Sequence, residues 1–211
     1  MMSMSRTAGP YMAGCEKAGK DRGSMQTLEA VVADTELLLQ LEEAVRTAGR
    51  HMTGIRVEER EIEQKEGRAN FVTHYDRENQ VYLRERFAEL TPYATFVGEE
   101  DDAHEGRLPE GFVWIVDPID GTTNFIKGLR LSCVAISLTR LRERIFGLVY
   151  NPFTDELFTA VRGEGAFLNG APIRVSGQPL QSGLAIFGTS PYYEGLPAQA
   201  FAKAQEYLEK C

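Results

Sequence analysis

The segment Phe112-Val-Trp-Ile-Val-Asp-Pro-Ile-Asp-Gly-Thr-Thr-Asn-Phe125 places an apolar strand directly before two aspartates and a glycine-threonine turn. Its first five residues have the aromatic and β-branched content of a buried strand. Asp117 and Asp120 follow, with Pro118 restricting the backbone between them. We expect the chain to leave the strand in a tight turn here, so that both carboxylates and the carbonyl of Ile119 face one point.

A second predicted strand also ends in carboxylates. The short segment Ala94-Thr-Phe-Val97 is predicted to be a strand and is followed by Gly98-Glu-Glu-Asp-Asp102. Mg²⁺ prefers oxygen ligands and leaves positions for substrate phosphate oxygens. We therefore predict a magnesium site built from Glu99, Asp117 and Asp120, with Glu99 bridging to a second ion about 3.5–4 Å away. Each segment alone is more often an ordinary turn or solvated loop, and it is their joint occurrence in this order that favours the metal site.

The residues after the second aspartate predict a phosphate site and a proton acceptor. Gly121-Thr122-Thr123 reads as the start of a short helix, where free backbone N–H groups favour a phosphate. Asp76 lies near the start of a helix predicted to end at Thr91-Pro92. An aspartate there is most often a helix cap. The alternative is that it accepts the hydroxyl proton of Thr122, which would in turn activate a metal-bound water. Both interpretations stay open.

Elsewhere the pattern predicts a helix, a meander of strands and a final strand and helix. Apolar residues at helical spacing run from Leu38 to Met52 and end at Gly54. The strands are predicted over residues 131–141, 144–150 and 156–161, with Asn169-Gly170 as a hairpin turn, a further strand at 184–187 and a helix from Pro197. The predicted fold class is α/β, in the form of an α+β layered sandwich.

Composition excludes several classes of protein. Lys and Arg number 23 against 31 Asp and Glu, and the resulting net charge of −8 argues against a nucleic-acid or anionic-membrane partner. The three cysteines have no CxxC spacing, so neither a disulfide framework nor a zinc site is indicated. No apolar run has the length of a membrane span, and the first residues lack a secretory apolar core. We expect a soluble, cytoplasmic protein in which residues 1–26 are a mobile extension.

Taken together, these motifs resemble the inositol monophosphatase family of magnesium-dependent sugar-phosphate phosphatases. Trp114 to Phe125 is similar to the first signature of that family, and Lys65 stands where the family has a basic residue. The other similar segments are Val72-Thr-His-Tyr-Asp76, Phe96-Val-Gly-Glu-Glu100, Gly147 to Pro152 and Gly163 to Gly170. The resemblance covers roughly residues 30 to 190.

The resemblance implies a sugar-phosphatase fold, usually in a homodimer, that hydrolyses phosphate monoesters by direct attack of water, with two or three Mg²⁺ ions in a complete site. The implied roles are as follows: Glu99, Asp117, Asp120 and the carbonyl of Ile119 bind metal; Glu99, Asp76 and Thr122 activate the water; Gly121 and Thr122 bind phosphate; Asp120 contacts a substrate hydroxyl; and Lys65 is accessory. Asn124-Phe125 favours inositol monophosphate as substrate over adenosine bisphosphate. Fructose 1,6-bisphosphate, histidinol phosphate and a non-catalytic metal-binding or dimerisation module remain alternatives.

The sequence departs from the family in one respect. Family members carry a second signature of the type Trp-Asp-x-Ala, whose aspartate completes the second metal site, but the only tryptophan here is Trp114. We interpret residues 27–182 as a largely complete N-terminal α+β domain and residues 183–211 as the start of a C-terminal α/β domain that is mostly missing. We accordingly expect this chain to be poorly active or inactive, and a full-length form to be an active phosphatase.

Overall fold

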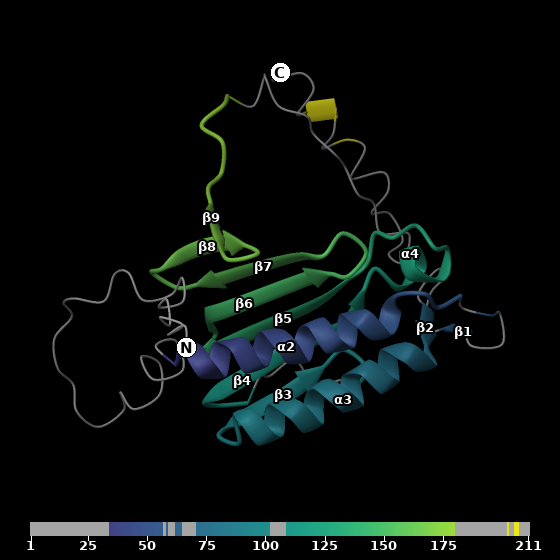
Figure 1. Cartoon of the computed structure of the whole chain (residues 1–211), viewed down its shortest axis with the longest axis horizontal. Coiled ribbons are helices and arrows are strands. Elements are labelled where there is room, and N and C mark those ends of the chain that lie inside the picture. The colour runs from purple at the N-terminus through teal and green to yellow at the C-terminus, as the bar shows by residue number, and fades with distance from the viewer. Residues whose placement is uncertain are drawn as a thin grey trace, which may run out of the picture.

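The computed structural model describes residues 34–56, 58, 62–64, 71–101, 109–179, 202 and 205–206. In this part of the chain, two long helices lie against a sheet of seven strands (Figure 1). The strand predicted at 184–187, the extension at 1–26 and Lys65 all lie outside the described residues, as does most of the helix predicted from Pro197.

The helices and strands alternate early and then give way to strands alone. The helices are α2 (Thr35–Met52), α3 (His74–Leu90) and α4 (Thr122–Ile126). The strands are β1 (Ile62–Gln64), β2 (Phe71–Thr73), β3 (Ala94–Gly98), β4 (Phe112–Asp120), β5 (Cys133–Arg140), β6 (Glu143–Asn151), β7 (Glu156–Val161), β8 (Gly165–Leu168) and β9 (Ala171–Ile173). This element order confirms the predicted mixture of helices with a meander.

The large sheet runs in chain order from β3 to β9, and only its first pair is parallel. From β4 onward every neighbour is antiparallel, and Asn169 and Gly170 form the predicted hairpin turn between β8 and β9. Strands β1 and β2 form a separate antiparallel pair. In the parallel pair, Gly98 stands opposite Val116, so the carboxyl ends of β3 and β4 lie at the same edge.

Helix α2 follows the predicted periodicity. The side chain of Asp34 caps it by accepting from the N–H of Leu37 at 3.1 Å. The apolar positions predicted from spacing, together with Ala44 and Gly49, face the sheet and are buried. The helix ends at Met52, where Thr53 turns to extended backbone. The amphipathic pattern therefore identified both the element and its buried face.

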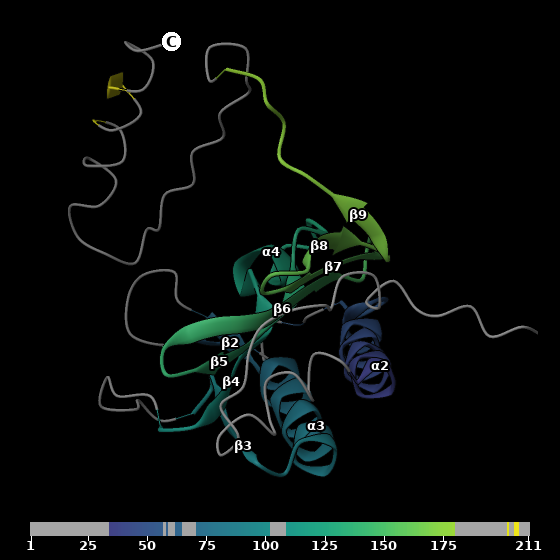
Figure 2. The ribbon, with the colours of Figure 1, turned by 90° about the vertical axis from the view of Figure 1, so that its left-hand side faces the viewer.

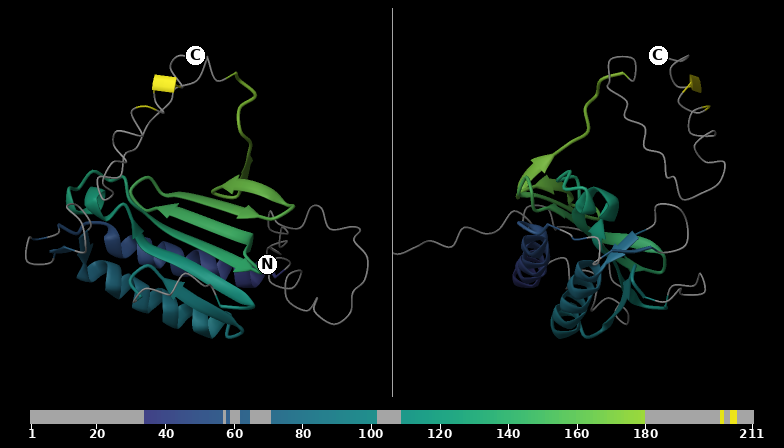
Figure 3. Two further views of the ribbon diagram at one scale, coloured as in Figure 1. Left: turned by 180° about the vertical axis from the view of Figure 1, so that it is seen from behind. Right: turned by 90° about the vertical axis from the view of Figure 1, so that its right-hand side faces the viewer.

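The core lies between the helices and one face of the sheet. Phe112, Trp114 and Val116 alternate along β4 and point into this core, and Trp114 is completely buried. Figure 2 shows α2 and α3 on the same side of the sheet, and Figure 3 shows the sheet from behind, with these helices beyond it. No helix among the described residues is both long and apolar enough to cross a membrane.

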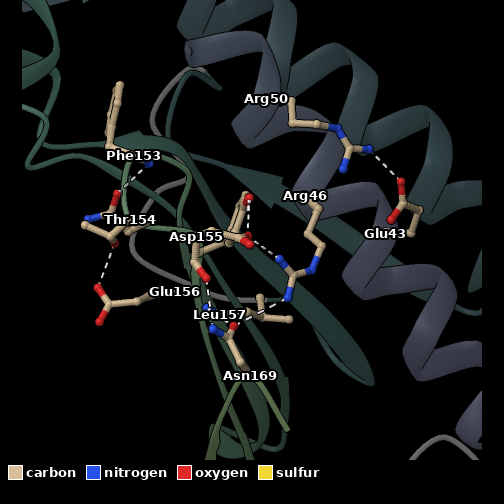
Figure 4. Close-up of polar contacts among 11 residues, drawn as sticks. Glu43, Arg46, Arg50, Phe153, Thr154, Asp155, Glu156, Leu157 and Asn169 are labelled. Atoms are coloured by element: carbon tan, nitrogen blue, oxygen red, sulfur yellow. Dashed lines mark hydrogen bonds and ion pairs between the residues drawn. The ribbon is translucent and has the colours of Figure 1, made fainter.

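A polar network joins α2 to the turns at one end of the meander (Figure 4). Arg46 donates to the carboxylate of Asp155 at 2.7 Å and to Oδ1 of Asn169 at 3.5 Å. Tyr150 donates its hydroxyl to the same carboxylate at 3.0 Å. Asp155 and Asn169 both adopt left-handed backbone, at φ 53° and 48°, which short polar side chains tolerate best. The network fixes the position of the meander relative to the helix.

The end of β4 corrects one prediction. The expected tight turn after Val116 is wrong: the strand continues to Asp120, which pairs with Cys133. Pairing shifts register between Asp117 and Asp120, in the manner of a bulge. Pro118 supplies the physical reason, because it has no N–H to donate to the ladder and so interrupts the pairing without ending it.

Candidate active site

Glu99 and Asp117 meet at the shared edge of β3 and β4. The N–H of Glu99 donates to the carbonyl of Val116 at 2.9 Å, which continues the parallel pairing one residue past the strand. Asp117 is half-buried, and its carboxylate accepts from the N–H of Ile119 at 3.1 Å. Parallel pairing has therefore brought together two carboxylates that are distant in sequence, as predicted.

The electrostatics of Asp117 reflect this crowding. The pKa of Asp117 is raised to about 9, and burial is the largest cause. The charge of Glu99, a hydrogen bond with Glu99 and the charge of Asp120 add to it in that order. The N–H of Ile119 opposes the shift. Apart from burial, every cause that raises this pKa is another acidic group, so a positive charge at this point would relieve the repulsion.

Asp120 lies close by but faces a different partner. The thiol of Cys133 donates to Oδ2 of Asp120 at 3.6 Å. Burial, followed by Asp120, raises the pKa of Cys133 to about 12, so this thiol is protonated. Among the described residues, no three His, Cys, Asp or Glu side chains already surround one ion position. The donors fit a hard cation chemically, because all are oxygens, and the charge of Asp120 already acts on Asp117.

Asp76 makes the contact with Thr122 that the sequence predicted. Thr122 lies with its Oγ1 3.2 Å from Oδ1 of Asp76 and 3.1 Å from the carbonyl oxygen of Ile119, so its one proton has two acceptors. The other carboxylate oxygen of Asp76 accepts from the N–H and the hydroxyl of Thr73, at 2.7 and 2.6 Å. Asp76 therefore caps α3 and also contacts Thr122, and its role in activating water stays a prediction.

The protonation of Asp76 depends on two opposing effects. Only 1% of the residue is exposed. Burial raises the pKa of Asp76, whereas its hydrogen bonds with Thr73 and Thr122 lower it, and burial is the larger effect. Removing one of these donors would raise the pKa of the carboxyl further.

Gly121 sets the start of α4. It lies in left-handed backbone at φ 85°, a conformation that costs other residues about 1–2 kcal/mol. A Cβ at this position would lie 3.0 Å from the carbonyl oxygen of Leu131. The loop that contains Leu131 and Ser132 is held near α4 by two hydrogen bonds. Asn124 donates to the carbonyl of Leu131 at 2.9 Å, and Ser132 donates to the carbonyl of Gly121 at 3.0 Å. Glycine is therefore favoured at position 121 for two reasons, the left-handed backbone and the close approach of the Leu131 carbonyl oxygen.

We expect Gly121→Ala to lower the free energy of unfolding by about 2 kcal/mol, through left-handed strain plus displacement of the loop at Leu131. Gly128→Ala is the matched control, because Gly128 is also left-handed, at φ 65°, but nothing lies within 4 Å of its Cβ position. Urea denaturation followed by circular dichroism compares the two. An equal loss in both variants would contradict a role for the Leu131 contact.

A depression of about 380 Å³ opens beside this edge of the sheet. Its polar lining includes Asp120, Asn124, Cys133, Asn151 and Glu156. Sequence reasoning did not identify Cys133, Asn151 or Glu156 as site residues. Cys133 and Glu156 lie in strands with no accompanying motif, and Asn151 lies in the segment Gly147 to Pro152, whose resemblance to the family suggested no role for it.

Sequence reasoning also missed Thr73, but the sequence does contain a signal for it. Thr73 stands three residues before Asp76, which is the spacing of a reciprocal cap at a helix start.

The sequence and the fold of this chain are similar to those of known proteins. A model of the inositol monophosphatase family matches residues 31–209. Inositol monophosphatase 3 of Solanum lycopersicum is 41% identical over 138 residues, which make up 64% of this chain and 51% of that protein. The extragenic suppressor protein suhB from Bartonella henselae has a solved structure that matches with a TM-score of 0.60 at 33% identity, over 68% of this chain and 56% of that one.

A further solved structure is also similar to this chain. It is an IMPase/NADP phosphatase complexed with Mg²⁺ and phosphate, and it matches with a TM-score of 0.57 at 25% identity, over 70% of this chain and 53% of that one. The present chain spans about half the length of the curated relatives that it matches.

Proposed function

We propose that this chain, which belongs to the inositol monophosphatase family, provides the metal site of an enzyme that hydrolyses a small phosphate monoester. Inositol monophosphate is the proposed substrate and Mg²⁺ the proposed cofactor. One observation carries the proposal: the Glu99 and Asp117 carboxylates lie together at one strand edge, and the Thr122 to Asp76 contact lies a few residues away.

The residues proposed to hold Mg²⁺ are Glu99, Asp117, Asp120 and the carbonyl of Ile119. Bound Mg²⁺ supplies a Lewis acid for the phosphoryl oxygens and favours the ionised form of the attacking water. Asp117 is already oriented by the N–H of Ile119, and Glu99 is hydrogen-bonded to Asp117. The backbone at Gly121 and the hydroxyl of Thr122 are proposed to face the phosphate from the other side.

Thr122 and Asp76 form the proposed path for a proton. When Thr122 donates its proton to Oδ1 of Asp76, the lone pairs of its Oγ1 are free to accept a proton from the attacking water. As that proton arrives at Oγ1, the original hydroxyl proton passes to Asp76. This relay requires Asp76 to be ionised beforehand, and the two donors from Thr73 help to keep it so.

The relay predicts a dependence on pH. Because burial raises the pKa of Asp76, activity should fall on acidification at a higher pH than an ordinary aspartate would give. Thr73→Val removes one donor that lowers this pKa, so we expect the acidic limb of the profile of kcat/KM against pH to move to higher pH. Thr139→Val is the control, because it removes a buried hydrogen bond to the carbonyl of Val113 instead. An unchanged acidic limb in Thr73→Val would contradict the relay.

Release of inorganic phosphate from inositol 1-phosphate, measured with and without Mg²⁺, tests the function itself. We expect any Mg²⁺-dependent release by the wild-type chain, however slow, to drop by at least about 100-fold in Asp120→Asn. Glu143→Gln, which alters an exposed carboxylate paired with Arg162, should leave it unchanged. Fructose 1,6-bisphosphate and histidinol phosphate serve as competing substrates. Release that continues without Mg²⁺, or that survives in Asp120→Asn, would overturn the proposal.

The alternative of a metal-binding or dimerisation module without catalysis predicts binding of Mg²⁺ and no phosphate release. The homodimer, the cytoplasmic location and the division at residues 182 and 183 remain predictions.

A further inference from the structure

The turn that carries Glu99 is fixed by its backbone. Glu99 is exposed, so the direction of its side chain depends on how its main chain is held. Its own N–H donates to Val116 at 2.9 Å, and the preceding N–H, of Gly98, donates to Oδ2 of Asp101 at 2.8 Å. Asp101 also donates its own N–H to the carbonyl of Gly98 at 3.3 Å. Two hydrogen bonds between Gly98 and Asp101 therefore close the turn that contains Glu99.

Gln80 of α3 holds the other side of this turn. Its Oε1 accepts from the N–H of Glu100 at 2.9 Å, and its Nε2 donates to Oδ1 of Asp101 at 3.2 Å. Only 6% of Gln80 is exposed. A Cβ on Gly98 would lie 2.0 Å from Oε1 of Gln80, so the turn approaches the helix as closely as glycine allows. The amides on both sides of Glu99 are thus held, one within the turn and one by the helix.

Arg84, one helical turn after Gln80, also connects α3 to the turn at residues 98–101. Its Nη2 donates to Oδ1 of Asp101 at 2.5 Å, and its guanidinium lies over the ring of Phe96 at 4.5 Å from the centroid. Gln80 and Arg84 are four residues apart, so they project from the same face of α3. Together they tie one carboxylate of the turn to a rigid element of the fold.

We propose that Gln80 is a positioning residue that, with Arg84 and Asp101, fixes the Glu99 carboxylate beside Asp117 for divalent-cation binding. The inference rests on the proposed function, and it extends the site to a helix that supplies no ligand from these positions. A carboxylate on an untethered turn would sample many directions, and holding it in advance avoids that entropic cost when the ion binds. Partners that orient metal ligands typically contribute about 10- to 100-fold to affinity.

Titration of the 211-residue chain with Mn²⁺, followed by the electron paramagnetic resonance signal of free Mn²⁺, tests this role. We expect Gln80→Leu, which removes the acceptor for Glu100, to weaken binding at least about tenfold. Gln80→Glu keeps that acceptor but sets a second carboxylate oxygen against Oδ1 of Asp101 in place of the amide donor, so we expect a loss of affinity smaller than that of Gln80→Leu. The control is Asn79→Ala, because Asn79 is a buried amide on the same helix that instead contacts Ala48 and His51 on α2.

The outcomes separate this role from simple stabilisation and from the proposed function. Asn79→Ala should lower stability to urea to a similar degree as Gln80→Leu and leave Mn²⁺ affinity unchanged. Wild-type binding that Gln80→Leu does not weaken, or that Asn79→Ala weakens equally, would overturn the positioning role alone. Absence of Mn²⁺ binding by a folded wild-type chain would overturn the proposed function and this inference with it.

Discussion

Asp117→Asn is expected to make the metal-free protein more stable at neutral pH, by on the order of 2 kcal/mol, while removing its affinity for Mg²⁺. The reason is the raised pKa of Asp117, about 9 against an ordinary value of 3.8. Asparagine resembles the protonated carboxyl: its oxygen can still accept from Ile119 and its amide can donate to Glu99. Urea denaturation without divalent cations measures the gain.

The sign of the pH dependence follows from the direction of the shift. The folded state binds the proton of Asp117 more tightly than the unfolded state, so this contribution to stability is full below the unfolded pKa and is lost as pH rises toward about 9. The metal-free wild type should therefore lose stability between about pH 4 and pH 9, and Asp117→Asn should show a weaker slope. Glu143→Gln should keep the wild-type slope. A variant less stable than wild type at neutral pH would contradict the account.

Trp114→Ala should produce the largest loss of stability, about 3–5 kcal/mol, which is a large part of the total stability of a typical domain. Trp114 is completely buried and packs edge-on against Phe87 and Phe146, with ring centroids 4.8 and 6.3 Å away. Its indole N–H donates to the hydroxyl oxygen of Thr91 at 2.9 Å. Alanine would leave a cavity where α3 and the sheet meet, and circular dichroism in urea measures the cost.

Trp114→Phe separates the packing of the ring from its hydrogen bond. The hydroxyl of Thr91 still donates to the carbonyl of Phe87 at 2.8 Å in this variant, so no buried donor loses its acceptor. We expect phenylalanine to cost about 1–2 kcal/mol, clearly less than alanine. A loss below about 1 kcal/mol in Trp114→Ala would contradict the importance of this contact in the core.

Much of the site could be predicted because its parts obey local rules. The strand before Asp117 and the helix before Thr91 follow from apolar periodicity and from proline. That Glu99 and Asp117 meet follows once their two strands are adjacent and parallel, because each carboxylate comes directly after the last parallel pair, Gly98 with Val116. Asp76 was ambiguous in sequence for a physical reason, since one carboxylate has two oxygens and the structure uses one for the cap and one for Thr122.

The remaining features depend on contacts between distant residues. The bulge at Pro118 could not be distinguished from a turn, because proline favours both, and only pairing of Asp120 with Cys133 decides between them. Gln80 carries no motif, and its role appears only when the turn at Gly98 packs on α3. The contact between Asp120 and the thiol of Cys133 likewise joins residues of neighbouring strands that share no sequence motif.

Calorimetric titration of Mg²⁺ into wild-type, Glu99→Gln, Asp117→Asn and Asp120→Asn proteins tests most directly whether the three carboxylates form one cation site. We expect binding to the wild type and a loss of at least about tenfold in affinity in each variant, including Asp120→Asn, because each substitution removes one negatively charged oxygen ligand. Glu143→Gln should bind as wild type does. Wild-type affinity in Asp120→Asn, or in either of the other two, would contradict a single shared site.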